Sequence, residues 1–404
     1  MRPELSQERH TYGARGGIIM DIGINGDSAV ALAWKQVDPD VCAAYPITPQ
    51  TIIVERFSDF VADGEVETEF VTAESEHSAM SICIGAASAG ARTVTATASA
   101  GMAYMWETLG IAAGMRVPIT MAVANRALSA PINIHCDHSD VMSARDLGWI
   151  LIFAENVQEA YDNAIMAMKI AEHPDVRLPV MHNLDGFILS HAIERMSTLE
   201  THTVKNFVGE YKSKHSLLDI EHPITHGAMD QQDYYFEHKY QLAEAMQGAI
   251  KVIEDVFEEF GSISGRKYDL LEPYRCDDAE YVSIVIGSTA GTIKEAVDQL
   301  REEGHKVGSI KVRVYRPFPA EMMSKLLEGK KAAAVLDRHM AIGSTGPMFG
   351  DVCATAIDLE KPPELVNYIY GLGGRDVPVS DLKKVYMDMI EGNCKKVNYL
   401  GVRI

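Results

Sequence analysis

The residues best suited to chemistry lie in short polar stretches that each follow an apolar, strand-like segment. A carboxylate at Glu76, a guanidinium at Arg126 and a hydroxyl at Thr48 stand out. A carboxyl group can hold or pass on a proton, and a guanidinium offers a planar pair of donors that grips a carboxylate. Because open α/β sheets bind ligands at the carboxyl ends of their strands, these stretches predict a small-molecule site.

Each of these residues also has an ordinary structural explanation. Glu76 could complement the positive end of the helix that follows it. Arg126 could be a solvated loop residue, and Thr48, held between Pro46 and Pro49, could cap the next helix. The stretches that contain such residues are Tyr45–Pro49, Glu74–His77, Ser99–Gly101, Asn125–Pro131 and Asp137–Asp140.

The elements that must position these residues are expected in residues 21–230, where short apolar strands alternate with amphipathic helices. The expected strands are Cys42–Ile47, Glu67–Val71, Thr93–Ala98, Val117–Val123, Leu151–Phe153 and Leu178–His182. The expected helices are Thr51–Ala62, Glu76–Ala89, Met102–Ala113 and Val157–Ala171. This alternation predicts an α/β fold with a parallel sheet that is covered on both faces.

Residues 1–20 are predicted to form an N-terminal arm, residues 231–270 a long helix (Asp233–Phe260) with a linker, and residues 271–404 a smaller α/β domain. The strands expected in that domain are Tyr281–Ile286, Ser309–Val314, Ala332–Leu336 and Leu365–Ile369. Its expected helices are Thr292–Glu302, Ala320–Leu327, Met348–Ile357 and Ser380–Glu391. Its glycine-rich turns lack the GxGxxG spacing of a dinucleotide site.

Composition excludes several classes of protein. A net charge of −20 disfavours nucleic acid and anionic membranes as partners, and no apolar run is long enough to span a bilayer. The 6 cysteines contain no CxxC pair, so no metal or cluster site is expected on this chain. Nothing before Gly16 is typical of a signal peptide, which predicts a cytoplasmic protein.

The polar stretches, taken in order, resemble the α subunit of pyruvate:ferredoxin oxidoreductase and its 2-oxoacid relatives. The resemblance extends from Asn25 to Asp376 and includes Leu184–His191, Gly287–Gly291, Arg316–Pro319 and Tyr370–Asp376. It implies a thiamine-diphosphate-binding domain of the pyrimidine type, followed by a domain like the C-terminal domain of transketolase. It also implies an enzyme of anaerobic metabolism that converts pyruvate and coenzyme A to acetyl-CoA and CO2 and passes electrons to ferredoxin.

The resemblance assigns roles to individual residues. Glu76 is implied to be the catalytic carboxylate that hydrogen-bonds the pyrimidine N1′ of thiamine diphosphate, and Thr48 and Arg126 are implied to bind the substrate. Further cofactor contacts are implied at Pro46, Ser99 and Gly101. In the second domain we expect no catalytic residue. We interpret Arg375 and Asp376 first as a structural pair between the domains, with contact to coenzyme A or to a partner subunit as the alternatives.

Half of the cofactor site is expected on another chain. The sequence lacks the Gly-Asp-Gly…Asn motif that holds the magnesium ion of thiamine diphosphate. The resemblance therefore implies that Mg²⁺ and the [4Fe–4S] clusters belong to β, γ and δ-type subunits of a hetero-oligomer, and that ferredoxin meets another subunit. Alone, this chain should be inactive.

The acyl group of the substrate is less closely defined. Ala100 stands where many relatives have Gln, and Cys136–Asp140 departs from the Gly-Asp-His/Gln-Gln-Asp of relatives. Branched-chain or aromatic 2-oxoacids are therefore alternatives to pyruvate. A non-catalytic scaffold subunit is the alternative from another class, although a scaffold would not need Glu76, Arg126 and Thr48 together.

Overall fold

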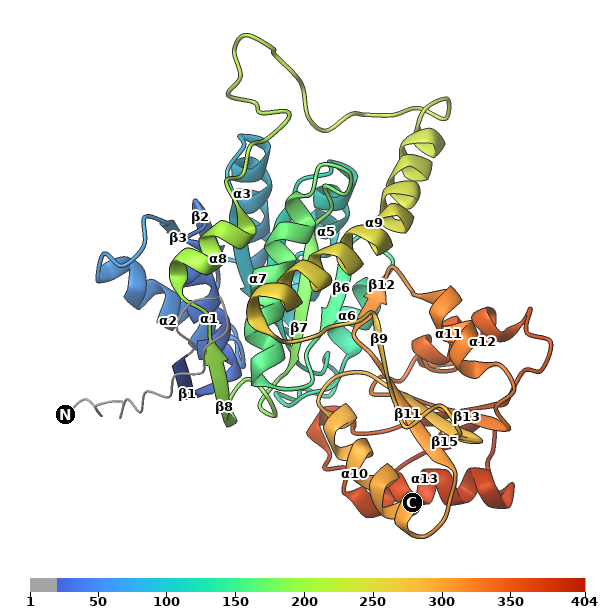
Figure 1. Cartoon of the computed structure of the whole chain (residues 1–404). Coiled ribbons are helices and arrows are strands. Elements are labelled where there is room, and N and C mark those ends of the chain that lie inside the picture. The colour runs from blue at the N-terminus through green and yellow to red at the C-terminus, as the bar shows by residue number, and fades with distance from the viewer. Residues whose placement is uncertain (1–19, 404) are drawn as a thin grey trace.

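The structure, a computed structural model, describes residues 20–403 (Figure 1). Apart from Met20, the predicted N-terminal arm lies outside these residues. Within them the strands form a 7-stranded, a 6-stranded and a 2-stranded sheet. No helix in residues 20–403 has the length and apolar character needed to cross a membrane.

The 7-stranded sheet carries the predicted site residues at its carboxyl edge. Its strand order is β12-β6-β7-β5-β4-β2-β3, and every neighbouring pair is parallel except β12 with β6. The strands are β2 (Val41–Ala44), β3 (Glu69–Thr72), β4 (Thr93–Thr97), β5 (Ile119–Asn125), β6 (Ile150–Phe153), β7 (Val180–Asp185) and β12 (Val314–Arg316). The predicted parallel sheet is confirmed.

Alternate residues of the sheet pack into separate hydrophobic cores on its two faces. Ala122 and Ala124 of β5 join one core, whereas Met121 and Val123 join the other. The first core is covered by α1 (Gly26–Val37), α2 (Thr51–Ala62), α7 (Val157–Glu172), α8 (Thr201–Val208) and α9 (Tyr235–Ser264). The second is covered by α3 (Glu76–Ser88), α4 (Ser99–Tyr104), α5 (Trp106–Gly114) and α6 (Ser139–Ala144).

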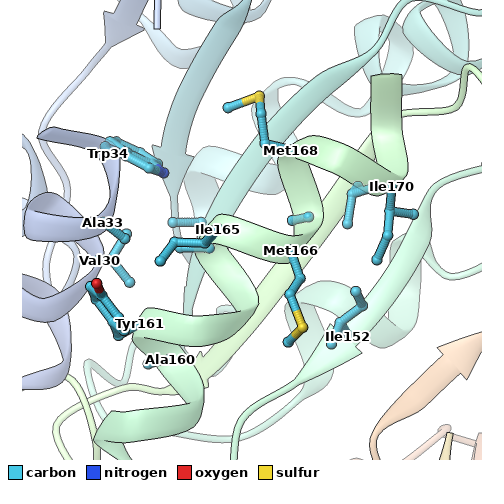
Figure 2. Packing of buried hydrophobic residues seen from close by; sticks show 14 of the residues in the cluster. Val30, Ala33, Trp34, Ile152, Ala160, Tyr161, Ile165, Met166, Met168 and Ile170 are labelled. Carbon is cyan, nitrogen blue, oxygen red and sulfur yellow. The ribbon is translucent and has the colours of Figure 1, made fainter. Parts of the chain in front are cut away.

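Helix α7 shows how local sequence signals and packing agree. The Asn156 side chain caps the helix by accepting a hydrogen bond of 2.9 Å from the Glu159 amide. Figure 2 shows Tyr161 and Ile165 of α7 pointing towards Trp34 and its neighbours on α1, where all three side chains are fully buried. This packing holds α1 and α7 together on one face of the sheet.

The 6-stranded sheet forms the second α/β unit, in the order β15-β14-β13-β10-β11-β9. All pairs are parallel except β9 with β11. The strands are β9 (Leu271–Tyr274), β10 (Tyr281–Val285), β11 (Val307–Val312), β13 (Ala332–Asp337), β14 (Glu364–Ile369) and β15 (Val397–Tyr399). The helices are α10 (Thr289–Glu302) and α13 (Val379–Glu391) on one face and α11 (Ala320–Leu327) and α12 (Pro347–Ala356) on the other.

Some elements differ from the prediction. The predicted strand Ser309–Val314 is divided between two sheets. Strand β11 ends at Val312, and after Arg313 the chain continues as β12 in the 7-stranded sheet, where Val314 pairs with Ile152. The predicted helix Met102–Ala113 is two helices, α4 and α5, which meet at Met105. The unpredicted strands β1 (Met20–Asn25) and β8 (Ile193–Thr198) form the 2-stranded antiparallel sheet.

The two α/β units pack against each other through a shared hydrophobic core. Core residues of both units, such as Phe153 of β6 and Leu271 of β9, belong to one hydrophobic cluster. Helix α9 packs with the first unit, because Val252, Ile253 and Val256 join its core. The exact domain boundaries at residues 230 and 270 stay a prediction.

Candidate functional site

The predicted site residues come together at the carboxyl edge of the 7-stranded sheet. Thr48 follows β2, Glu76 follows β3, Ser99 follows β4 and Arg126 follows β5. The Arg126 guanidinium donates to the Thr48 carbonyl at 2.9 Å, and the Ser99 hydroxyl donates to the Ala127 carbonyl at 2.5 Å. These bonds join the loops after β2, β4 and β5 into one surface.

Glu76 is placed by the start of α3. Ser75 caps this helix through its side chain, which accepts from the Ser78 amide, so Glu76 occupies the first helical position. The Glu76 side chain is buried, with 7% of its surface exposed. Glu74, the neighbouring carboxylate that sequence could confuse with it, is exposed and accepts a bond of 2.5 Å from the Ser78 hydroxyl.

The Glu76 carboxylate has no hydrogen-bond donor among residues 20–403. It lies against Gly101, where a Cβ atom would come within 2.6 Å of Glu76 Oε1 and 2.5 Å of Thr97 Oγ1. The Thr97 hydroxyl is buried and also has no partner in the described part of the chain. Since buried polar groups are normally hydrogen-bonded, this pair is chemically suited to an incoming donor.

Arg126 is a buried cation whose contacts are all to carbonyl oxygens. Its side chain is 7% exposed, and Nε donates to the Asn133 carbonyl at 3.0 Å while Nη1 donates to Thr48. No carboxylate pairs with it in the described residues. A guanidinium has more N–H donors than these two carbonyls occupy and cannot lose its charge, so the arrangement fits an anionic ligand.

Asp140 organises the loops that carry Ser99 and Arg126, a role that sequence reasoning missed. Its Oδ2 accepts from the amides of Ser99 at 3.1 Å and Arg126 at 2.9 Å, and its Oδ1 accepts from the Asn125 side chain at 3.1 Å and the Val141 amide at 2.7 Å. Burial raises the pKa of this carboxyl to about 6, although these donors oppose the rise. The Asp137–Asp140 stretch was visible in the sequence, but its bonding across the sheet edge was not.

The remaining predicted residues occupy different positions in the site. Pro46 and Thr48 are exposed, and Thr48 contributes its carbonyl to Arg126. Ser99 is fully buried and uses its hydroxyl on a backbone carbonyl, so its interaction within the chain is structural. Gly101 allows the backbone to approach Glu76, since a side chain there would overlap the carboxylate.

Beside the site, a buried interdomain cluster consists of Cys136, His138, Asp185 and Arg338. Asp185 accepts from Arg338 at 3.1 Å and bonds His138 at 2.8 Å, and Ser288 also donates to it. Burial alone would raise the pKa of Asp185, but these neighbours hold it well below its ordinary value. The possible ligand atoms of Cys136, His138 and Asp185 lie close enough together to hold a metal ion. Arg338, however, already supplies a positive charge to Asp185.

A second cluster, of three carboxylates, could also hold a metal ion by its geometry but is paired with the protein's own cations. Glu155, Glu159 and Glu272 surround the buried ammonium of Lys311. Burial raises the pKa of Glu159, but Arg313 and Lys311 outweigh it and set the value to about 2. These clusters join the two units and differ in kind from the unpartnered groups at Glu76 and Arg126.

Comparison with known protein families bears on this arrangement. The family model described as "Pyruvate flavodoxin/ferredoxin oxidoreductase, thiamine diP-bdg" matches residues 32–258, more than half of the chain. The chain belongs to the pyruvate:ferredoxin oxidoreductase family. A second model of this family, "Pyruvate:ferredoxin oxidoreductase core domain II", matches residues 279–382. The fold class predicted from the sequence is therefore confirmed.

Curated relatives within the pyruvate:ferredoxin oxidoreductase family are similar over nearly their whole length. The pyruvate synthase subunit PorA of Thermotoga maritima is 53% identical over 96% of this chain and 99% of its own. The PorA subunit of Methanocaldococcus jannaschii is 50% identical over 94% and 97%. The ketoisovalerate oxidoreductase subunit VorA of Pyrococcus abyssi is 44% identical over 91% and 92%.

Solved structures agree with the fold of this family. A 2-oxoglutarate:ferredoxin oxidoreductase from Magnetococcus marinus aligns with a TM-score of 0.69 and 20% identity over 92% of this chain. The present chain spans 65% of the length of that one. A split gene transketolase aligns with a TM-score of 0.54 and 12% identity, over 91% of this chain and 99% of its own. At these identities the likeness shows the fold alone.

Proposed function

We propose that this chain is the α subunit of a 2-oxoacid:ferredoxin oxidoreductase that oxidatively decarboxylates pyruvate. The acyl group would pass to coenzyme A, and the electrons would pass to ferredoxin. The observation that carries the proposal is the pair of buried, unpartnered groups at one sheet edge, the Glu76 carboxylate and the Arg126 guanidinium. The family of the chain supports this function independently of that geometry.

Thiamine diphosphate fits the groups that the chain presents. Its pyrimidine ring offers a nitrogen that, when protonated, can donate to the unpartnered Glu76 carboxylate, and Gly101 lets the backbone lie beside that contact. When bound, thiamine diphosphate supplies the electron sink for decarboxylation. Glu76 would hold the proton at the pyrimidine N1′, and its burial would keep competing water away from that proton.

Arg126 would bind and orient the carboxylate of the substrate. Its bonds to the Asn133 and Thr48 carbonyls fix the guanidinium plane, and the free N–H groups remain for a ligand. The exposed Thr48 side chain would add a hydroxyl near the same carboxylate. Pro46, Ser99 and Gly101 would shape the loops around the cofactor.

The rest of the active site would come from partner chains. Because the sequence has no Gly-Asp-Gly…Asn motif, we assign Mg²⁺ and the cofactor diphosphate to a β-type subunit. The iron–sulfur clusters would lie on β, γ or δ-type subunits, and ferredoxin would dock there, away from a chain with a net charge of −20. We expect the assembled enzyme in the cytoplasm.

Pyruvate is the substrate that the relatives favour. Pyruvate synthase subunits reach 53% and 50% identity with this chain, whereas the ketoisovalerate subunit from Pyrococcus abyssi reaches 44%. Because the ketoisovalerate subunit is only a few per cent less identical than the second of these, branched-chain 2-oxoacids are the substrates against which pyruvate should be compared. A scaffold without catalytic function is disfavoured, because it would leave a buried cation and carboxylate without a purpose.

The assembled enzyme should be assayed with a panel of 2-oxoacids, coenzyme A and a viologen dye as electron acceptor. We expect the highest kcat/KM for pyruvate and at least about tenfold lower values for 3-methyl-2-oxobutanoate and for aromatic 2-oxoacids. A preference for a branched-chain or aromatic acid would contradict the pyruvate assignment. Absence of turnover with every 2-oxoacid, in a preparation that binds thiamine diphosphate, would contradict the whole class.

A further inference from the structure

A glycine turn of the second unit reaches the site of the first. The turn, Gly371–Gly374, follows β14 and includes a short 3-10 helix, Leu372–Gly374. Gly371, Gly373 and Gly374 have φ values of +63°, +60° and +78°, in the left-handed region that favours glycine. The backbone conformation of the turn therefore favours glycine at these three positions.

One side of the turn is anchored to the interdomain cluster. Arg338 Nε donates to the Gly371 carbonyl at 3.2 Å, and Arg338 Nη1 donates to Asp185 at 3.1 Å. The Arg338 side chain is almost fully buried. Arg338 thereby connects the turn to Asp185 at the end of β7 in the first unit.

The other side of the turn packs on the loop that supports Arg126. The Asn133 side chain donates to the Gly373 carbonyl at 3.1 Å, and the Gly374 amide donates to the Cys136 carbonyl at 2.6 Å. The contact is so close that a Cβ on Gly373 would lie 2.5 Å from Asn133 Nδ2. A Cβ on Gly374 would lie 2.4 Å from His135 Cβ.

Asn133 is the link between this turn and the substrate site. Its side chain bonds Gly373, and its backbone carbonyl accepts from Arg126 Nε at 3.0 Å. We propose that the second unit positions the substrate-binding arginine, with the Gly371–Gly374 turn setting Asn133 and Asn133 setting the Arg126 guanidinium. Gly373 and Asn133 are therefore positioning residues. The inference rests on the proposed role of Arg126 in binding the substrate carboxylate.

The test compares two glycine substitutions in the assembled enzyme. Gly373→Ala forces a side chain against Asn133, whereas Gly392→Ala places one at a similar φ of +71° with nothing within 4 Å. Both changes strain the backbone, but only the first pushes on the Arg126 support. We expect Gly373→Ala to raise KM for pyruvate about tenfold with kcat changed less than about twofold, and Gly392→Ala to leave both near the wild-type values.

A double substitution separates a specific effect from a general one. In the Arg126→Gln background, Gly373→Ala should raise KM no further, because the group through which it acts is already absent. KM for coenzyme A should stay unchanged in every variant. Equal KM values for pyruvate in the Gly373→Ala and Gly392→Ala enzymes would overturn the inference, and so would a full additional increase in the Arg126→Gln background.

The same measurements distinguish failure of the inference from failure of the proposed function. If Arg126→Gln alone leaves KM for pyruvate unchanged, the role of Arg126 is wrong and the inference falls with it. If Arg126→Gln raises KM and Gly373→Ala does not, only the positioning role is wrong. Should Gly373→Ala fail to assemble, Asn133→Ala decides: an increase in KM of about fivefold supports the inference, and an unchanged KM overturns it.

Discussion

Arg126 and Asp185 are both buried charged residues at the ends of neighbouring strands, yet their surroundings are opposite. Asp185, at the end of β7, interacts with His138, Arg338 and Ser288. The Arg126 guanidinium, just after β5, bonds only carbonyl oxygens and has no carboxylate partner within residues 20–403. One charge is satisfied by the protein, and we propose that the other is satisfied by a ligand.

Whether a buried charged group has a partner of opposite charge indicates a ligand site better than burial alone does. Asp27 is also buried without a partner, but burial raises the pKa of its carboxyl well above the ordinary value, so it can remain neutral. An arginine cannot become neutral in this way. A buried guanidinium without an anion is therefore a stronger indication of a ligand site than a buried acid is.

The largest expected effect is on the satisfied charge. Asp185→Asn leaves the Arg338 guanidinium without its counter-charge in a buried position. We expect the free energy of unfolding, measured with urea, to fall by about 3–5 kcal/mol. Arg126→Gln is the matched control and should lower it by less than about 2 kcal/mol, because removal of an uncompensated buried charge offsets the loss of two hydrogen bonds to carbonyl oxygens. A similar loss in both variants would contradict the distinction between the two charges.

Asp140, which braces the site loops, should give a pH-dependent effect of intermediate size. Its pKa of about 6 in the folded chain lies above the ordinary 3.8, so the folded state holds a proton that the unfolded state has released between these values. This retained proton stabilises the folded state by roughly 3 kcal/mol relative to neutral pH. The stabilisation is fully present below about pH 4 and is lost as the pH rises through about 6.

Asp140→Asn lacks this titration and supplies the comparison. Between pH 4 and pH 7, the unfolding free energy of wild type should fall by about 2.5 kcal/mol relative to that of Asp140→Asn. Urea unfolding at several pH values measures it. A difference that does not vary with pH would show that the carboxyl titrates alike in both states.

The smallest effect is expected at Thr48, whose side chain is exposed at the rim of the site. Thr48→Val keeps the carbonyl that holds Arg126 but removes the hydroxyl. Loss of one hydrogen bond to the substrate carboxylate, worth about 1.5 kcal/mol, should raise KM for pyruvate about tenfold. Thr48→Ser retains the hydroxyl and should behave like wild type. Equal KM values in the Val and Ser variants would remove Thr48 from the substrate site.

Much of the fold could be predicted because strand and helix periodicities are local. The strands before Glu76, Ser99 and Arg126 lie close to their expected positions. The division of the predicted strand Ser309–Val314 could not be predicted, because an apolar run does not say which sheet its residues join. The pairing of β1 with β8 also escaped prediction, since it joins residues such as Met20 and Thr198 that are far apart in sequence.

The candidate site divides in the same way. Residue type and family resemblance indicated Glu76, Arg126 and Thr48, and the structure places them at one sheet edge. The sequence could not show that Asp140 joins two loops, because those bonds depend on the folded backbone. The predicted pair of Arg375 and Asp376 is wrong: Arg375 donates to the Gly401 carbonyl and Asp376 accepts from the Val377 amide. The contact with the first unit comes from the glycines before them.

The central claim is that the Glu76 carboxylate acts on the pyrimidine ring of thiamine diphosphate. The most direct measurement is the rate at which the cofactor's thiazolium C2 proton exchanges with deuterium in the assembled enzyme, compared for wild type, Glu76→Gln and Glu74→Gln. We predict a fall of at least about a hundredfold in Glu76→Gln and none in Glu74→Gln. Exchange in Glu76→Gln at the wild-type rate, with the cofactor bound, would contradict the account.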